Sequence, residues 1–214
     1  MTGSDLKTQA ESILDGETIP TDFFYQLLNI AKTKLEEQRV WQYLKKLDSS
    51  NTASSGNNYT TGFTLPTDFA QDYKLKVGLD TEYFPVSFED QHVYRNSSHR
   101  YYLDIGGNKF YLLGNGVGGT IYFFYKRFTD DLTSSTSPVF PTRFHPILAF
   151  YVAAYYQMGV DSDDVFARMS PQNRSAAQEL QNAMISWDFS LSLRSQNNQV
   201  GVANSQPEVV IGDM

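Results

Sequence analysis

The chain of 214 residues contains no cysteine, which excludes a disulfide framework and any thiolate chemistry. Histidine is also scarce, because His92, His99 and His145 are the only three in the sequence. They form no H-E-x-x-H pattern, and a zinc site of mixed ligands would need cysteine. His145 directly precedes Pro146 at an expected helix start, which favours a structural role. We therefore expect no metal site built on these histidines.

Motifs for nucleotide binding and nucleophilic catalysis are missing as well. The sequence has no Walker lysine motif and no serine in a G-x-S-x-G context. Gly114, Gly116 and Gly119 match G-x-G-x-x-G, but a dinucleotide fingerprint requires a helix after the glycines. A strand-like run follows instead at residues 120–128, so the glycines are expected to form a hairpin loop. The sequence predicts no cofactor and no enzymatic activity.

A cluster of carboxylates at Asp161, Asp163 and Asp164 raises the question of calcium binding. An EF-hand loop needs glycine at its sixth position and a closing glutamate at its twelfth. Those positions are occupied by Phe166 and Gln172, so the pattern fails. Acidic residues at the start of a helix are favoured by the helix dipole, and we interpret the cluster as a helix N-terminus.

The chain also lacks a basic patch and a long apolar run. Its formal net charge is -7, and the densest basic stretch, at residues 32–46, is interrupted by Glu36 and Glu37. No apolar run approaches the roughly 18 residues of a membrane span. The start of the chain does not have the order of a signal peptide. We therefore expect no membrane contact, no specific DNA binding, and a protein assembled in a cytoplasm.

Strand patterns are present from residue 62 onward. Tyr73, Leu75 and Val77 alternate with Lys74 and Lys76, which is the period of a half-buried strand. Residues 78–81 form the expected turn and residues 82–86 the returning strand. Ser87 and Asp90 then match a capping box, which predicts a short helix.

Three further strands are expected at residues 100–105, 109–113 and 120–128, because Gly/Asn turns separate short runs rich in aromatic residues. Together with the preceding hairpin they predict an antiparallel β meander within residues 62–128.

Helices are expected at both ends of this β region. Apolar residues near a period of 3.6 predict a helix over residues 22–46, preceded by a weakly amphipathic segment, residues 1–21. Pro146 begins a helix that is apolar nearly all round, and a further helical stripe continues to Phe189. The predicted fold class is α+β, with an N-terminal helix and a C-terminal helical pair (residues 146–189) around the β region.

The expected core covers residues 22–189 and includes a polar loop at residues 49–61, while residues 1–21 precede it and residues 190–214 follow it. Residues 49–61 are polar and of low complexity, so they have too little apolar surface to offset their ordering entropy. Residues 190–214 show no clear helical stripe. We expect a surface loop at residues 49–61 and an extended C-terminal arm at residues 190–214.

The order of these features resembles a known family. The helix ending in Arg39-x-Trp41, the LPTDF run at residues 65–69, the Tyr125-Lys126-Arg127 strand and the His145-Pro146 helix start carry the resemblance. It extends over about residues 20–189 and is to the head–tail adaptor (connector) proteins of tailed bacteriophages. The family implies a structural virion protein in the neck, a homo-oligomeric ring that is usually twelvefold. The ring joins the portal protein to the tail and continues the DNA channel used in ejection.

The resemblance also implies partners and contact residues. We expect the portal protein, a tail or neck protein below it, and further copies of this chain as partners, while DNA passes without specific binding. The hypothetical portal-contacting arm contains Leu191, Leu193, Val200, Val202, Val209, Val210 and Ile211. The hypothetical inter-subunit or tail-facing residues are Asn57, Asn58, Tyr59, Asn115 and Val117.

Three alternatives stay open at this point. The chain could act lower in the virion, as a neck or tail completion protein. It could be a β-rich glycan-binding module, in which case Tyr94, Tyr101, Tyr102 and Tyr111 would be exposed in one groove. It could also be an unrecognised hydrolase, which would require a convergent acid/base pair with perturbed pKa values in a pocket.

Overall fold

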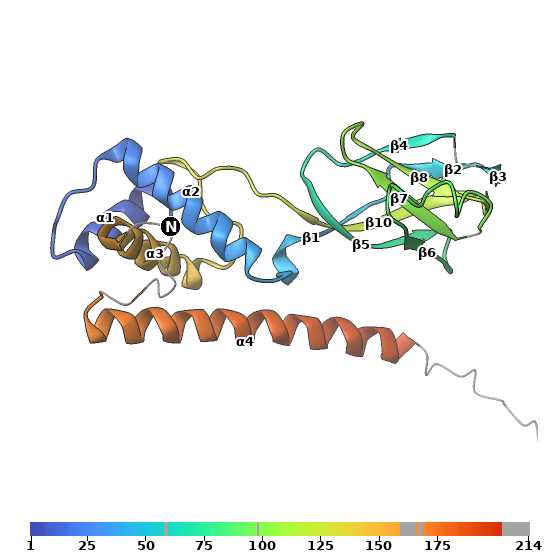
Figure 1. Ribbon diagram of the computed structural model, residues 1–214. Coiled ribbons are helices and arrows are strands. Elements are labelled where there is room, and N and C mark those ends of the chain that lie inside the picture. The colour runs from blue at the N-terminus through green and yellow to red at the C-terminus, as the bar shows by residue number, and fades with distance from the viewer. Residues whose placement is uncertain (58–59, 98, 159–165, 167–168, 203–214) are drawn as a thin grey trace, which may run out of the picture. The chain divides into compact units, whose positions relative to one another are not determined.

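The computed structural model describes the chain except for residues 58–59, 98, 159–165, 167–168 and 203–214 (Figure 1). Two compact units divide it. The helical unit consists of Met1–Tyr43 together with Asp131–Met214, and the β unit consists of Leu44–Asp130. The chain therefore passes from the helical unit to the β unit and back. The predicted α+β class is confirmed.

The helical unit is organised around one buried helix. Its elements are α1 (Gly3–Ile13), α2 (Thr21–Glu37), the short 3-10 helix η2 (Thr142–Phe144), α3 (Pro146–Met158) and α4 (Pro171–Val202). Every residue at positions 147–155 of α3 is buried, and both α1 and α2 pack against this helix. The nearly continuous apolar sequence of α3 thus corresponds to a helix covered on all sides, as predicted.

The first helix begins with a reciprocal cap. The Thr2 hydroxyl accepts the main-chain N–H of Asp5, and the Asp5 carboxylate accepts the main-chain N–H of Thr2. This hydrogen bonding lowers the pKa of the Asp5 carboxyl. Leu6 and Ala10, both expected on one face, are buried. The weakly amphipathic N-terminal segment is therefore a helix of the core and not a peripheral extension.

The prediction that α2 continues to residue 46 is wrong, because the helix ends at Glu37. Trp41 follows after a short turn, and its indole nitrogen donates a 2.7 Å hydrogen bond to the main-chain oxygen of Leu35. Leu44 ends the 3-10 helix η1 (Gln42–Leu44). Trp41 and Leu44 are fully buried, so they continue the apolar spacing without continuing the helix.

The prediction of an extended C-terminal arm beginning at residue 190 is also wrong for the part that the structure describes. The helix α4 continues without interruption through residue 202. Its first half contributes Ala177, Met184 and Asp188 to the buried interior of the helical unit. The expected helix N-terminus at Asp161, Asp163 and Asp164 lies outside the described residues.

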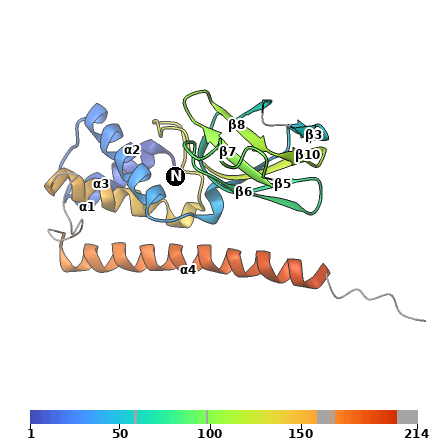
Figure 2. The same ribbon diagram turned by 45° about the vertical axis from the view of Figure 1, so that its right-hand side comes forward.

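The β unit is a curled sheet, mostly antiparallel, visible in Figure 2. The strands are β1 (Lys45–Asp48), β2 (Thr52–Ala53), β3 (Gly56–Asn57), β4 (Gly62–Thr64), β5 (Phe69–Val77), β6 (Thr81–Pro85), β7 (Arg100–Asp104), β8 (Lys109–Leu113), β9 (Asn115–Gly116) and β10 (Gly119–Arg127). The main sheet has the order β1-β10-β5-β6-β7-β8-β4, with β2 added beside β10 and a separate β3–β9 pair.

This topology departs from a simple meander at two points. The β6–β7 pair is parallel, and β10 returns to lie between β1 and β5. The capping box at Ser87 forms, since Ser87 Oγ accepts the main-chain N–H of Asp90, but the segment consists of turns and no helix follows. Short strands β2 and β3 occupy the loop predicted at residues 49–61.

The core of the β unit is aromatic. The ring centroids of Phe110 and Phe123 lie 4.9 Å apart in stacked geometry, and Phe63 stacks on Phe110 at 5.3 Å. Leu75 and Val77 are fully buried, while Lys74 and Lys76 are only partly buried. The alternation read from the sequence therefore places Leu75 and Val77 inside as expected, whereas Tyr73, which was expected on the same face, is 44% exposed.

Candidate interaction surfaces

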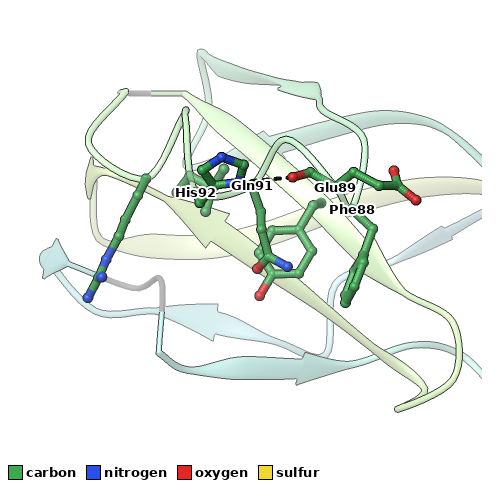
Figure 3. Close-up of a pocket in the computed structure, with 7 residues that line it drawn as sticks. Phe88, Glu89, Gln91 and His92 are labelled. Atoms are coloured by element: carbon green, nitrogen blue, oxygen red, sulfur yellow. Dashed lines mark hydrogen bonds between the residues drawn. The ribbon is translucent and has the colours of Figure 1, made fainter.

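A recess of the β unit is formed by the turns that follow β6 (Figure 3). It has a volume of about 570 Å³ and is lined by Phe88, Glu89, Gln91, His92, Arg95, Tyr102 and Leu113. The His92 ring nitrogen Nδ1 lies 2.9 Å from the main-chain oxygen of Glu89, which holds the turn closed. Phe88 and Glu89, which lie between the capping residues Ser87 and Asp90, are among the residues that line the recess.

Stacked aromatic rings form the floor of the recess. The ring of Tyr102 lies parallel to that of Tyr111 at 4.9 Å, and Phe88 meets Tyr102 edge to face at 5.9 Å. Tyr102 is buried, as is its neighbour Tyr101, whose hydroxyl donates a hydrogen bond to the Asp72 carboxylate. Burial raises the pKa of Tyr101. Because Tyr101 and Tyr102 belong to the interior, the tyrosines do not form the exposed groove that a glycan-binding module requires.

Four of the side chains that line the recess are charged or titratable: Glu89, His92, Arg95 and Tyr102. Across the described part of the chain, no group of three or more His, Cys, Asp or Glu side chains is placed to hold a metal ion.

A second recess, of about 460 Å³, lies in the helical unit where α4 passes η2. Aromatic side chains dominate it: the ring of Tyr43 lies 5.5 Å from Phe140 and 6.5 Å from Trp187. Burial raises the pKa of Tyr43, and the nearby carboxylates Glu36 and Asp188 add to this effect. Leu191, one of the residues assigned to the portal-contacting arm, also lines this recess.

His145 is a buried residue of the same region. Its Nε2 lies 2.7 Å from the main-chain oxygen of Phe140, and its Nδ1 lies 3.2 Å from the main-chain oxygen of Met1. Only 2% of the residue is exposed, and this burial lowers the pKa of its imidazole. The side chain joins the chain start to the segment before α3, in agreement with a structural role.

The residues assigned to the portal-contacting arm fall into two groups. Leu191 and Leu193 lie in α4, and residues 200 and 202 belong to its last turns, while Val209, Val210 and Ile211 lie outside the described residues. Sequence reasoning missed Phe189, which is 57% exposed and precedes the 45% exposed Leu193 by four positions. That spacing places both on one helix face and could have identified the pair.

The residues assigned to an inter-subunit or tail-facing surface come together in part. Asn57 in β3 and Asn115 in β9 are directly opposite partners in an antiparallel pair. Val117, just after β9, is 48% exposed, whereas Asn58 and Tyr59 lie outside the described residues. The G-x-G-x-x-G loop is therefore joined to the polar loop of residues 49–61, and β10 follows it as predicted.

One face of the main sheet was not recognised from the sequence as a surface. Lys45 stands opposite Lys126, and Lys74 and Lys76 stand opposite Phe124 and Tyr122. Paired residues point to the same side of a sheet, so the four lysines share the face that is turned away from the core. We call these four residues the lysine face.

Exposed apolar side chains on α4, open recesses and a charged sheet face are features common in proteins that act through contact with other proteins. The family model of the SU10 adaptor proteins matches residues 1–200, and the chain belongs to this family. The predicted resemblance to bacteriophage head–tail adaptors is thereby confirmed. The protein is a phage adaptor, a structural component of the virion.

Two further searches gave negative results. A search of curated proteins finds no match for the chain. Among the described residues, none of the helices is both long enough and apolar enough to cross a membrane.

Proposed function

We propose that the chain forms a ring in the virion neck that joins the portal protein to the tail and continues the DNA channel. The membership of residues 1–200 in an adaptor family is the observation that carries this proposal. In this assignment the helical unit and the β unit provide the contacts that stack the ring between its two neighbours. Copy number is taken as twelve, as is usual for adaptors of this kind.

The distribution of charge supports passage of DNA without binding. The β unit has as many acidic as basic residues, so the whole net charge of -7 falls on the helical unit. A channel wall with this charge would repel phosphate and leave DNA free to move. This reasoning assigns the wall of the DNA channel to the helical unit.

The C-terminal part of α4 is the proposed portal contact. It continues past the buried Asp188 and then carries the exposed Phe189 and Leu193. Apolar side chains in this position gain free energy when a partner covers them. The residues of this contact are the assigned arm residues, from Leu191 onward, together with Phe189.

The test is electron microscopy of the protein mixed with the portal ring of the same phage. The full-length chain is compared with a chain truncated after Phe189, which keeps Ala177, Met184 and Asp188 in place. We expect the full-length chain to add a ring to the portal and the truncated chain to fail. We also expect the chain alone to be monomeric at micromolar concentration.

Other outcomes separate the parts of the proposal. If both forms add a ring, the protein is an adaptor but the C-terminal arm is not its portal contact. If neither form binds the portal while the full-length chain binds a tail component, the protein belongs lower in the neck. A ring that forms without the portal contradicts assembly on the portal.

A further inference from the structure

The lysine face differs from the rest of the molecule in its charge. The chain as a whole is acidic, yet Lys45, Lys74, Lys76 and Lys126 share one side of three adjacent strands, β1, β10 and β5. Those strands are consecutive neighbours in the main sheet, and all three are labelled in Figure 1. Lys45 and Lys126 are directly opposite partners, an arrangement of like charges that is unfavourable in a sheet. Approach of an acidic partner would relieve this repulsion.

Apolar side chains are interspersed with the lysines. Leu47, opposite Phe124, is 50% exposed, and Tyr73 is 44% exposed with Lys45 Nζ 5.4 Å from its ring centroid. The acidic residue Glu82 stands opposite Lys76 and forms a 3.1 Å ion pair with Lys74. Exposed apolar groups within a charged surface are typical of protein interfaces. Binding to a phosphate backbone would need neither the apolar groups nor the glutamate.

A surface of complementary charge is present on the helical unit. No lysine or arginine occurs at residues 8–31, whereas Asp15, Glu17 and Asp22 in this segment are exposed. The Tyr156 hydroxyl donates a 3.2 Å hydrogen bond to Glu17, and the Tyr156 ring lies 6.1 Å from that of Phe23, which is 43% exposed. Glu17 and the exposed Phe23 are thus connected through Tyr156, and we call Asp15, Glu17 and Asp22 the acidic corner.

We infer that the lysine face of one copy of this chain docks on the acidic corner of the next copy. The contact is heterologous, since it joins two different surfaces, and heterologous contacts close into rings when the rotation allows. The inference rests on the proposed ring and names its subunit contact. Each side combines charge of one sign with exposed apolar groups, which gives both attraction and a fixed orientation.

The first test uses Lys45→Glu, assayed as ring formation on the portal. This substitution places a glutamate opposite Lys126 and so favours the sheet itself, which separates loss of assembly from loss of folding. Lys109→Glu is the matched control, because Lys109 is exposed on β8 and lies outside the lysine face. We expect about tenfold or greater loss of bound copies for Lys45→Glu and none for the control.

A charge exchange tests the named partner surface. Glu17→Lys alone should also reduce ring formation, while Glu179→Lys, an equal change at an exposed site of α4, should not. The double variant Lys45→Glu/Glu17→Lys restores opposite charges across the contact and should recover assembly. Normal assembly of Lys45→Glu alone would overturn the inference while leaving the adaptor function intact, whereas failure of the unsubstituted chain to bind the portal would overturn both.

The absence of cysteine permits a direct measurement of the contact. A chain carrying Lys45→Cys and Glu17→Cys should give a ladder of disulfide-linked oligomers on the portal, and each single variant should not. A dimer from Lys45→Cys alone indicates a symmetric contact and contradicts the inference. The inference is also overturned if the protein binds duplex DNA in a gel-shift assay and Lys45→Glu removes that binding without affecting ring formation on the portal.

Discussion

The carboxylate of Asp188 in α4 accepts a 2.6 Å hydrogen bond from the main-chain nitrogen of Gln42, which lies 146 positions earlier in the sequence. The other carboxylate oxygen lies 3.3 Å from the guanidinium of Arg39, and Asp188 is only 1% exposed. Gln42 belongs to the turn through which the chain leaves the helical unit. One buried carboxylate therefore fixes the C-terminal helix to the end of α2.

Loss of this carboxylate should destabilise the helical unit. Asp188→Ala leaves the Gln42 N–H without its acceptor and the Arg39 guanidinium without its ion-pair partner, which we expect to cost about 2–3 kcal/mol of the free energy of unfolding. Asp188→Asn retains one acceptor oxygen and should cost roughly half as much. Urea unfolding measures both, with Glu179→Ala, at an exposed site of the same helix, changing stability by less than about 0.5 kcal/mol. Equal values for Asp188→Ala and Glu179→Ala would show that the bond does not hold α4.

His145 should make stability depend on pH near neutrality. Burial lowers the pKa of its imidazole in the folded protein, whereas the unfolded chain titrates near about 6.5. The unfolded state therefore takes up a proton first, and the stability present above pH ~6.5 falls as the pH is lowered, by up to about 1.4 kcal/mol per pH unit.

The check is the slope of stability against pH between about 7.5 and 5.5. His145→Gln does not titrate and can still donate to Phe140, so its curve should be flatter than that of the unsubstituted chain. His92→Gln, at an exposed site, should leave the slope unchanged. Carboxyl groups whose pKa values are lowered, such as that of Glu11 beside Lys7, change the stability only at more acidic pH. They therefore do not contribute to the slope measured in this pH range. Parallel curves for His145→Gln and the unsubstituted chain contradict the assignment.

The sequence predicted elements whose determinants are local. The alternation around Leu75 identified β5, and Pro146 marked the first residue of α3. The end of α2 was not predicted because Trp41 and Leu44 keep helical spacing, although they are buried beyond the helix. The actual partner of residues 45–48 is β10, some eighty positions away in the chain, and this pairing has no local signal.

The surfaces were less predictable than the elements. Asn57 and Asn115 were selected separately, and only the β3–β9 pairing brings them together. The lysine face depends on the register of three strands, since Lys45 and Lys126 become neighbours only after β1 pairs with β10. The helix after Ser190 was missed because its Ser, Gln and Asn residues form no apolar stripe, while a continuing helix needs none.

Gly3 should resist substitution although it lies in the first turn of a helix. A Cβ atom there would stand 2.1 Å from the main-chain oxygen of Thr133 and 2.9 Å from a ring carbon of Tyr25. The Gly3 nitrogen also donates a 3.0 Å hydrogen bond to the main-chain oxygen of Thr136, which holds this segment in place. Gly3→Ala should therefore cost about 1–3 kcal/mol.

The sign of that change is diagnostic, because alanine in place of glycine usually stabilises a helix by about 0.5–1 kcal/mol. Gly106→Ala is the control, since the nearest atom to its added Cβ is an Asp104 carboxylate oxygen at 3.7 Å. Thermal unfolding should separate the two variants clearly. A Gly3→Ala protein as stable as the unsubstituted chain would mean that the segment at Thr133 moves away at little cost.

The exposed pair on α4 allows the portal contact to be tested without shortening the chain. Phe189→Ser/Leu193→Ser removes two large apolar side chains that are 57% and 45% exposed, so stability should change little. Each side chain buried against a partner contributes about 1–2 kcal/mol, and their joint loss should weaken portal binding tenfold or more. Titration of the portal ring with labelled protein measures the affinity.

Leu79→Ser provides the control for this measurement, because Leu79 is 82% exposed at the turn between β5 and β6 and belongs to neither proposed contact. Its affinity for the portal should equal that of the unsubstituted chain. Truncation after Phe189 removes main chain and side chains together, whereas the double serine variant keeps the length and charge of the helix. If truncation abolishes binding and the serine variant does not, residues beyond Leu193 make the contact, and the helix face at Phe189 and Leu193 is turned away from the portal.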